Sequence, residues 1–206
     1  MLIPSYDPAL DPDGVKQHIP HMDHFFDNSL QTGLMRDIAI DLEVLGEHLV
    51  LLGNQGVGKN KIVDRVCQVP WNSLSLLFIC RLLFSFQLLN RPREYVQLHR
   101  DTTVTQLMFT THLRNSTIEY IDSPLLRAIK YGRIIIIDEA DKAPEHVVAV
   151  FRSLAGQGEL SLADGRRVRR VREREDDVVV NEGFRMILLA NRPGYRECSE
   201  RIFIVT

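Results

Sequence analysis

A glycine-rich loop that directly follows a short apolar run constrains the fold of this chain more than any other feature. The run is Leu49–Leu52, and the loop after it fits the pattern G-x-x-x-x-G-K. Glycines let the backbone turn tightly, so that successive N–H groups point at an anionic ligand. A helix beginning near Lys59 would add its positive N-terminal end. The candidate nucleotide-binding residues are Gly53, Asn54, Gln55, Gly56, Val57, Gly58, Lys59 and Asn60. The alternative is an ordinary glycine-rich turn between a strand and a helix.

The last two residues of this loop predict the ligand. Lys59 is expected to reach the β- and γ-phosphates of a nucleoside triphosphate. Asn60 stands where the pattern usually has Ser or Thr, whose hydroxyl binds Mg²⁺. An amide oxygen is also an acceptable ligand for this hard cation. We therefore expect ATP and Mg²⁺ as cofactors, with Asn60 as a metal ligand whose coordination is weakened or mediated by water.

A second motif lies at the end of another apolar run. Ile134–Ile137 consists of four β-branched residues, which suits a parallel strand covered on both faces, and Asp138 and Glu139 follow it. Ligands of open parallel sheets sit beyond the carboxyl ends of the strands. Asp138 is therefore a candidate ligand of Mg²⁺, and Glu139 a candidate catalytic base that polarises the attacking water. A solvated acidic turn after a core strand is the alternative.

A third apolar run, Phe184–Ala190, is followed directly by Asn191. The side chain of Asn191 could hydrogen-bond a γ-phosphate or the attacking water. Taken alone, an Asn at the end of a strand is more often a turn residue. Between the last two runs, Gly158–Val168 alternates in polarity around an Asp-Gly pair, which predicts a β-hairpin. We expect the charged segment 166–177 to form its mobile outer part. Further expected elements are helices at 30–47, 123–131 and 144–155, and a strand at 95–99.

The order of these motifs resembles that of the AAA+ ATPases, P-loop NTPases in which a catalytic Asn occupies the position of Asn191. The hairpin after the acidic strand resembles the MoxR and dynein-related branch. Four segments, 48–61, 89–95, 97–103 and 188–193, are similar to one large mitochondrial member of that branch, including the unusual Asn60.

The resemblance implies an α/β fold with a parallel sheet flanked by helices. It divides the chain into a lead-in loop at 1–28, a nucleotide-binding core at 29–194 and a divergent tail at 195–206, with the C-terminal lid missing. It also implies ATP hydrolysis in a complete parent protein, assembly into a ring or with neighbouring modules, and a mitochondrial location, although no targeting segment is recognisable. A nucleotide-binding structural module without appreciable hydrolysis is the alternative. No residue is assigned as arginine finger.

Composition narrows the classes of partner. The net charge of −2 shows no excess of positive charge that would indicate binding to nucleic acid. Acidic residues also alternate with the hairpin arginines, which favours a solvated surface over a nucleic-acid site. Those arginines are Arg166, Arg167, Arg169 and Arg170.

The evenly spaced His18, His21 and His24 could suggest a metal, but without a second cluster of ligands a solvated segment is favoured. Three cysteines without metal spacing fit a reducing compartment.

One internal block disagrees with the rest of the pattern. The apolar stripe that begins at Ile62 is broken by Val69–Trp71, because proline inside a helix costs about 3 kcal/mol. The apolar stretch 74–89 is short of the ~20 residues that a membrane span needs and contains Arg81, so we expect no span. If residues 69–87 are deleted, Gln68 joins Leu88 and helical spacing is restored.

The codons that could encode the block suggest an intron. Introns begin with GT, as every valine codon does, and Val69 opens the block. Introns end in a pyrimidine-rich tract followed by CAG, and such a tract can encode the end of the block. We therefore hypothesise that residues 69–87 are a translated intron. RNA sequencing across this region should show mostly reads that join the codons of Gln68 and Leu88. The neighbouring exon junctions serve as the control for coverage, and dominant transcripts that retain the block would refute the hypothesis.

Overall fold

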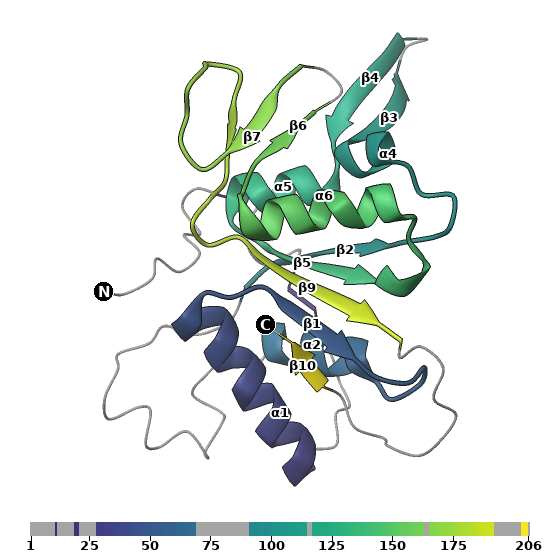
Figure 1. The fold of residues 1–206 in the computed structure, drawn as a ribbon, viewed down its shortest axis with the longest axis vertical. Helices are drawn as coiled ribbons and strands as arrows, with labels where there is room; N and C mark the ends of the chain where they lie inside the picture. Colours follow the sequence, from purple (N-terminus) through teal and green to yellow (C-terminus); the bar gives the residue numbers. More distant parts are fainter. Residues whose placement is uncertain are drawn as a thin grey trace.

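The computed structural model describes residues 11, 19–20, 28–68, 91–114, 117–162, 165–191 and 203–205. Its centre is a sheet in the order β10-β1-β9-β5-β2, with helices on both faces (Figure 1). The strands β1, β9, β5 and β2 are parallel to one another, and β10 joins the edge antiparallel to β1. The predicted α/β class with a parallel sheet flanked by helices is therefore confirmed.

The helices and strands follow one another along the chain in this order: α1 Ser29–Ile40, a π-helical turn Asp41–Leu45, β1 Leu49–Leu52, α2 Lys59–Gln68, β2 Arg93–Gln97, α4 Val104–Met108, β3 Phe109–Arg114, β4 Thr117–Asp122, α5 Pro124–Tyr131, β5 Ile134–Asp138, a 3₁₀ turn Ala140–Lys142, α6 Glu145–Gly156, β6 Leu160–Ser161, β7 Arg167–Arg169, β8 Val178–Val179, β9 Arg185–Ala190 and β10 Phe203–Val205. The expected helices agree with α1, α5 and α6, and the expected strand at 95–99 begins two residues earlier. Among the described helices, none is long and apolar enough to cross a membrane.

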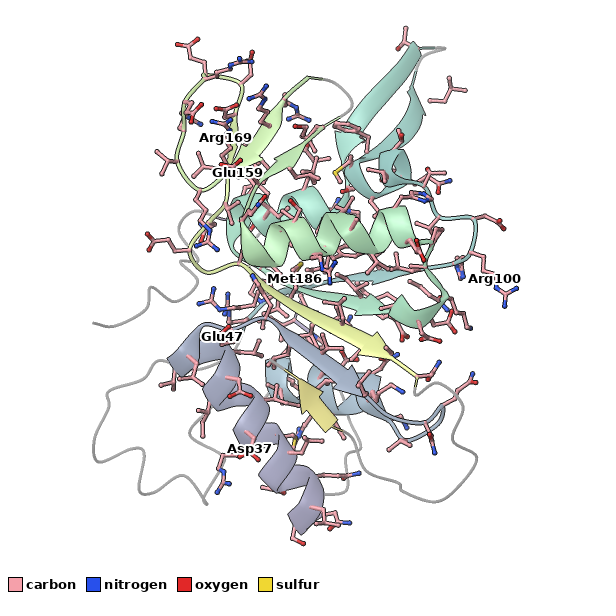
Figure 2. The ribbon with its side chains drawn as sticks, viewed as in Figure 1. Asp37, Glu47, Arg100, Glu159, Arg169 and Met186 are labelled. Atoms are coloured by element: carbon pink, nitrogen blue, oxygen red, sulfur yellow. The ribbon has the colours of Figure 1, made fainter. Side chains whose placement is uncertain are left out.

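The strand β5 is buried on both faces, as its four isoleucines predict. Ile135 and Ile137 pack into the cluster formed with α5 and α6, whereas Ile134 and Ile136 pack into the cluster formed with α1 and α2. Met186 of β9, labelled in Figure 2, belongs to the first cluster. Alternate residues of the central strands therefore bind the two helical layers to one sheet.

Two hairpins project from the same side of the core (Figure 1). The predicted one is present as β6 and β7, which pair antiparallel, with β8 parallel to β7. The loop between β7 and β8 is closed by Asp177, whose carboxylate accepts from the backbone N–H groups of Glu173 and Arg174. The other hairpin, β3–β4, was not expected from the sequence.

The hairpin arginines are only partly the solvated surface that the sequence suggested. Arg166 donates to Asp122 of β4 at 3.3 Å, and its guanidinium lies 5.4 Å from the ring centroid of Phe109. Arg169 forms an ion pair with Glu173. Arg166 therefore connects the two hairpins, which pattern reading along one segment does not reveal.

A buried ion network anchors the lead-in segment to the core. Arg133 is fully buried and donates to both carboxylate oxygens of Asp11, at 2.5 and 2.7 Å. It also donates to Glu94 of β2 at 2.6 Å. Removing Arg133 would leave the buried carboxylate of Asp11 without the guanidinium that neutralises it, which is strongly destabilising. At least one residue of the predicted loop 1–28 is thus part of the folded core.

Several sequence predictions fall on parts of the chain outside the described residues. These are the proposed intron block 69–87, the histidines 18, 21 and 24, and most of the tail 195–206. The helix α2 ends at Gln68, directly before the block. Continuity of that helix into Leu88 stays a prediction.

The imidazole of His48 joins β1 to β9 and should make stability depend on pH. Its Nδ1 accepts from the backbone N–H of Met186 at 3.1 Å, and burial together with Arg185 lowers the pKa of His48 from 6.5 to about 4. The unfolded chain binds a proton below pH 6.5 that the folded chain excludes until about pH 4. This contribution to stability is therefore present above pH 6.5 and is lost as the pH falls towards 4.

Replacing His48 by Asn keeps an acceptor but removes this titration. Between pH 7 and pH 4, wild type should lose on the order of 2 kcal/mol more unfolding free energy than His48→Asn, measured by urea denaturation. The exposed His146→Asn serves as the control and should follow wild type. Equal pH dependence of the wild-type protein and His48→Asn would contradict the assignment.

Candidate functional site

The glycine-rich loop joins the end of β1 to the start of α2. Gly56 and Gly58 have φ angles of +86° and +85°, in the left-handed region that side chains disfavour. A Cβ at either position would meet no protein atom within 4 Å, so backbone conformation rather than packing requires glycine there. The helix α2 begins at Lys59, and its N-terminal end therefore faces the loop.

The Lys59 side chain lies between the loop and the end of β9. Its Nζ donates to the carbonyl oxygens of Gly53 and Asn54, at 2.7 and 3.0 Å, and to Asn191 Oδ1 at 3.3 Å. Only 8% of the residue is exposed, and this burial lowers the pKa of Lys59, while Asp138 and Asp141 oppose the shift. The structure thus brings together the predicted residues Lys59 and Asn191, which are 132 positions apart.

The carboxylate of Asp138, at the end of β5, receives three hydrogen bonds. Oδ2 accepts from Asn60 Nδ2 at 2.7 Å and from the Tyr95 hydroxyl at 2.8 Å, and Oδ1 accepts from the backbone N–H of Glu139 at 2.8 Å. Burial acts to raise the pKa of Asp138, but these bonds and the nearby Lys59 outweigh it and lower the pKa. The group is therefore a stable anion beside the loop.

Glu139 occupies an unusual backbone position. Its φ and ψ angles are 55° and 38°, in the left-handed region, and it is the one non-glycine residue with positive φ among the described residues. Its carboxylate accepts from Lys142 Nζ at 2.5 Å and from Gln97 Nε2 at 3.2 Å. The bond from Lys142, followed by that from Gln97, lowers the pKa of Glu139. Such strained positions concentrate at functional sites.

Asn191 is held by an acid that the sequence motifs did not single out. Asp141 Oδ1 accepts from the backbone N–H of Asn191 at 3.0 Å, and the Asn191 amide nitrogen lies 3.4 Å from both oxygens of Asp141. The amide nitrogen thus faces Asp141, which turns the amide oxygen towards Lys59.

Sequence reasoning missed four side chains of the site. These are Tyr95, Gln97, Asp141 and Lys142. The first two alternate along β2, and a period of two places them on one face of a strand. That signal becomes useful only when β2 is known to neighbour β5.

The donors and acceptors of the site fit a nucleotide with a divalent cation. Loop amides, the start of α2 and the Lys59 ammonium match an anionic phosphate chain. Asp138 and Asn60 supply the hard oxygen atoms that Mg²⁺ prefers. The amide N–H of Asn60 donates a hydrogen bond to Asp138, so the amide oxygen of Asn60 is the atom that could bind the cation.

Comparison with known families gives the same assignment. Residues 48–201 match the AAA domain (dynein-related subfamily). The chain belongs to this family. The match begins before β1 and extends past Asn191, so it contains all the predicted site residues of the AAA domain.

Two relatives extend the comparison. The chain is 47% identical over 175 residues to von Willebrand factor A domain-containing protein 8 of Mus musculus, covering 83% of this chain and 8% of that protein. It is 28% identical over 108 residues to Protein NorQ of Paracoccus denitrificans (strain Pd 1222), covering 52% of this chain and 37% of NorQ. The matched segment of this chain therefore spans a small part of the first relative and about a third of the second.

Solved structures support the fold alone. A putative ATPase from Cytophaga hutchinsonii ATCC 33406 has a TM-score of 0.53 at 15% identity, covering 82% of this chain and 40% of that one. NtrX from Brucella abortus has a TM-score of 0.52 at 16% identity, covering 82% and 31%.

Proposed function

We propose that this AAA domain binds ATP with Mg²⁺ and that the complete parent protein hydrolyses ATP to ADP and phosphate. The observation that carries the proposal is the convergence of Lys59 of α2, Asp138 of β5 and Asn191, directly after β9, beside the glycine-rich loop. The ends of parallel strands form such sites because their carboxyl termini lie at one edge of the sheet.

In this proposal the loop amides and Lys59 bind the phosphates. Lys59 already bonds two loop carbonyls, so its ammonium lies at the mouth of the loop. Mg²⁺, when bound, would neutralise charge that develops on the phosphate oxygens. Asp138 and Asn60 would hold it, with Asp138 kept anionic by its three hydrogen bonds.

Glu139 would act as the base for hydrolysis. Water attacks the γ-phosphorus, its proton passes to the Glu139 carboxylate, and the bond from phosphorus to the bridging oxygen of ADP breaks. The lowered pKa keeps the Glu139 carboxylate ionised at neutral pH, which is the form that a base requires, while the hydrogen bond from Lys142 reduces its basicity. Lys142 Nζ binds Oε1 of Glu139 and Gln97 Nε2 binds Oε2, so each oxygen keeps an acceptor position for the attacking water.

A second candidate function is nucleotide binding that holds an assembly together without turnover. Asn60 favours it, because an amide replaces the usual hydroxyl beside the cation. In either case we propose that the domain associates with further AAA domains, in a ring of copies or within the parent chain. We also propose a mitochondrial location, which rests on the resemblance of the sequence motifs alone.

The first experiment measures ATP binding by calorimetry. Lys59→Met should weaken binding by at least tenfold, because charge-assisted hydrogen bonds to the phosphates are lost. Lys61→Met, an exposed lysine on the same helix, is the matched control and should bind normally. Equal affinity of Lys59→Met and wild type would contradict ATP binding at this loop.

The second experiment separates hydrolysis from a structural role in the full-length parent. Glu139→Gln should lower the steady-state rate by roughly 100-fold or more, since it removes the proton acceptor, while ATP binding persists. The exposed Glu145→Gln, on α6, controls for loss of a nearby charge. An unchanged rate in Glu139→Gln would rule out the assignment of this base, and a parent without turnover would favour the structural role.

A further inference from the structure

Tyr95 contacts the site although no motif marks it. Its hydroxyl and the Asn60 amide nitrogen donate to the same oxygen of Asp138, Oδ2, at 2.8 and 2.7 Å. A carboxylate oxygen offers about two acceptor positions, so these two donors saturate Oδ2. The backbone N–H of Glu139 binds Oδ1 at 2.8 Å. The carboxylate of Asp138 is thus held by three donors from three different parts of the chain.

The bond from Asn60 determines which way its amide faces. An ionised carboxylate can only accept, so the NH₂ group must be the one that faces Asp138. The amide oxygen therefore points away from the carboxylate. Within the described ranges no hydrogen bond to that oxygen is found, and Mg²⁺ readily binds amide oxygens.

Tyr95 is itself supported from the helix that carries Asn60. The Arg93 guanidinium lies 5.9 Å from the centroid of the Tyr95 ring, and Arg93 donates to Asp64 at 3.1 Å. Asp64 lies one helical turn after Asn60 on α2. These contacts connect two positions of α2 through the edge strand β2. Asn60 binds Asp138, Asp138 binds Tyr95 of β2, the Tyr95 ring contacts Arg93, and Arg93 binds Asp64 of α2.

We propose that Tyr95 is a positioning residue of the metal subsite: through Asp138 it holds the Asn60 amide with its oxygen available to a divalent cation. This inference rests on the proposed binding of ATP and Mg²⁺ and adds to it a residue outside the motifs. A Ser or Thr hydroxyl can rotate its proton to donate to a carboxylate while its oxygen binds a metal. The nitrogen and oxygen of an amide are fixed in one plane, so Asn60 depends on a carboxylate held in one orientation.

The test compares nucleotide binding with and without the cation. Calorimetry on the 206-residue chain measures a non-hydrolysable ATP analogue in Mg²⁺ and in EDTA. Tyr95→Phe should leave the affinity in EDTA within about twofold of wild type and reduce the gain from Mg²⁺ by about five- to tenfold. Tyr131→Phe removes a hydroxyl elsewhere and should change neither value.

A spectroscopic measurement reads the metal directly. Mn²⁺ replaces Mg²⁺, and electron paramagnetic resonance counts free Mn²⁺ in the presence of protein and analogue. Tyr95→Phe should weaken Mn²⁺ binding by the same factor as in calorimetry. Asp64→Asn, which loosens Arg93 and keeps the Tyr95 hydroxyl, should weaken it by about twofold, and it carries the test if Tyr95→Phe does not fold.

A double-mutant cycle with Asn60→Ser distinguishes positioning from a general structural role. In the Asn60→Ser background the further change Tyr95→Phe should reduce the Mg²⁺-dependent gain in affinity by less than about twofold. The reason is that the introduced serine hydroxyl can rotate to donate to Asp138 without help from Tyr95. Equal losses in both backgrounds, a loss that is as large in EDTA, or no loss at all would overturn the inference while leaving ATP binding intact. If wild type and Lys59→Met both fail to bind the analogue, the proposed function itself fails.

Discussion

Burial of β5 on both faces is the constraint on which the rest of the structure depends. Its isoleucines alternate between two helical layers, so β5 must lie inside the sheet with neighbours on each side. Because those neighbours are parallel, their carboxyl ends reach one edge together. The acids after β5, the Asn after β9 and the side chains of β2 then meet the loop after β1.

The site is built from paired polar contacts that hold each chemically important group. Lys59 is bound by loop carbonyls, Asp138 by three donors, Glu139 by Lys142, and Asn191 by Asp141. Buried or strained groups of this kind are stable only when their neighbours satisfy them. The supporting residues come mainly from β2 and the turn after β5, which makes the edge strand part of the site rather than a cover for the core.

Much of this could be predicted from local patterns. A phosphate-binding loop is implied by the glycines at 56 and 58 and by the lysine that follows them. A run of β-branched residues implies a strand that is covered on both faces. The Asp-Gly pair predicted the hairpin. The hairpin β3–β4 was missed because its sequence has neither a clean alternation of apolar and polar residues nor an Asn-Gly or Asp-Gly pair. The link from Arg166 to Asp122 was missed because a contact across 44 positions has no local signal.

By itself, the sequence determined the phosphate loop, the acidic strand, the Asn after the last central strand and hence the family. These features depend on backbone conformation and on burial, which neighbouring residues encode. Only the tertiary structure decided that Tyr95 and Gln97 reach the acids, that Asp11 pairs with Arg133, and that Asn60 faces Asp138 with its nitrogen. Those contacts depend on strand order and on the direction of single side chains, which pairing between distant segments sets.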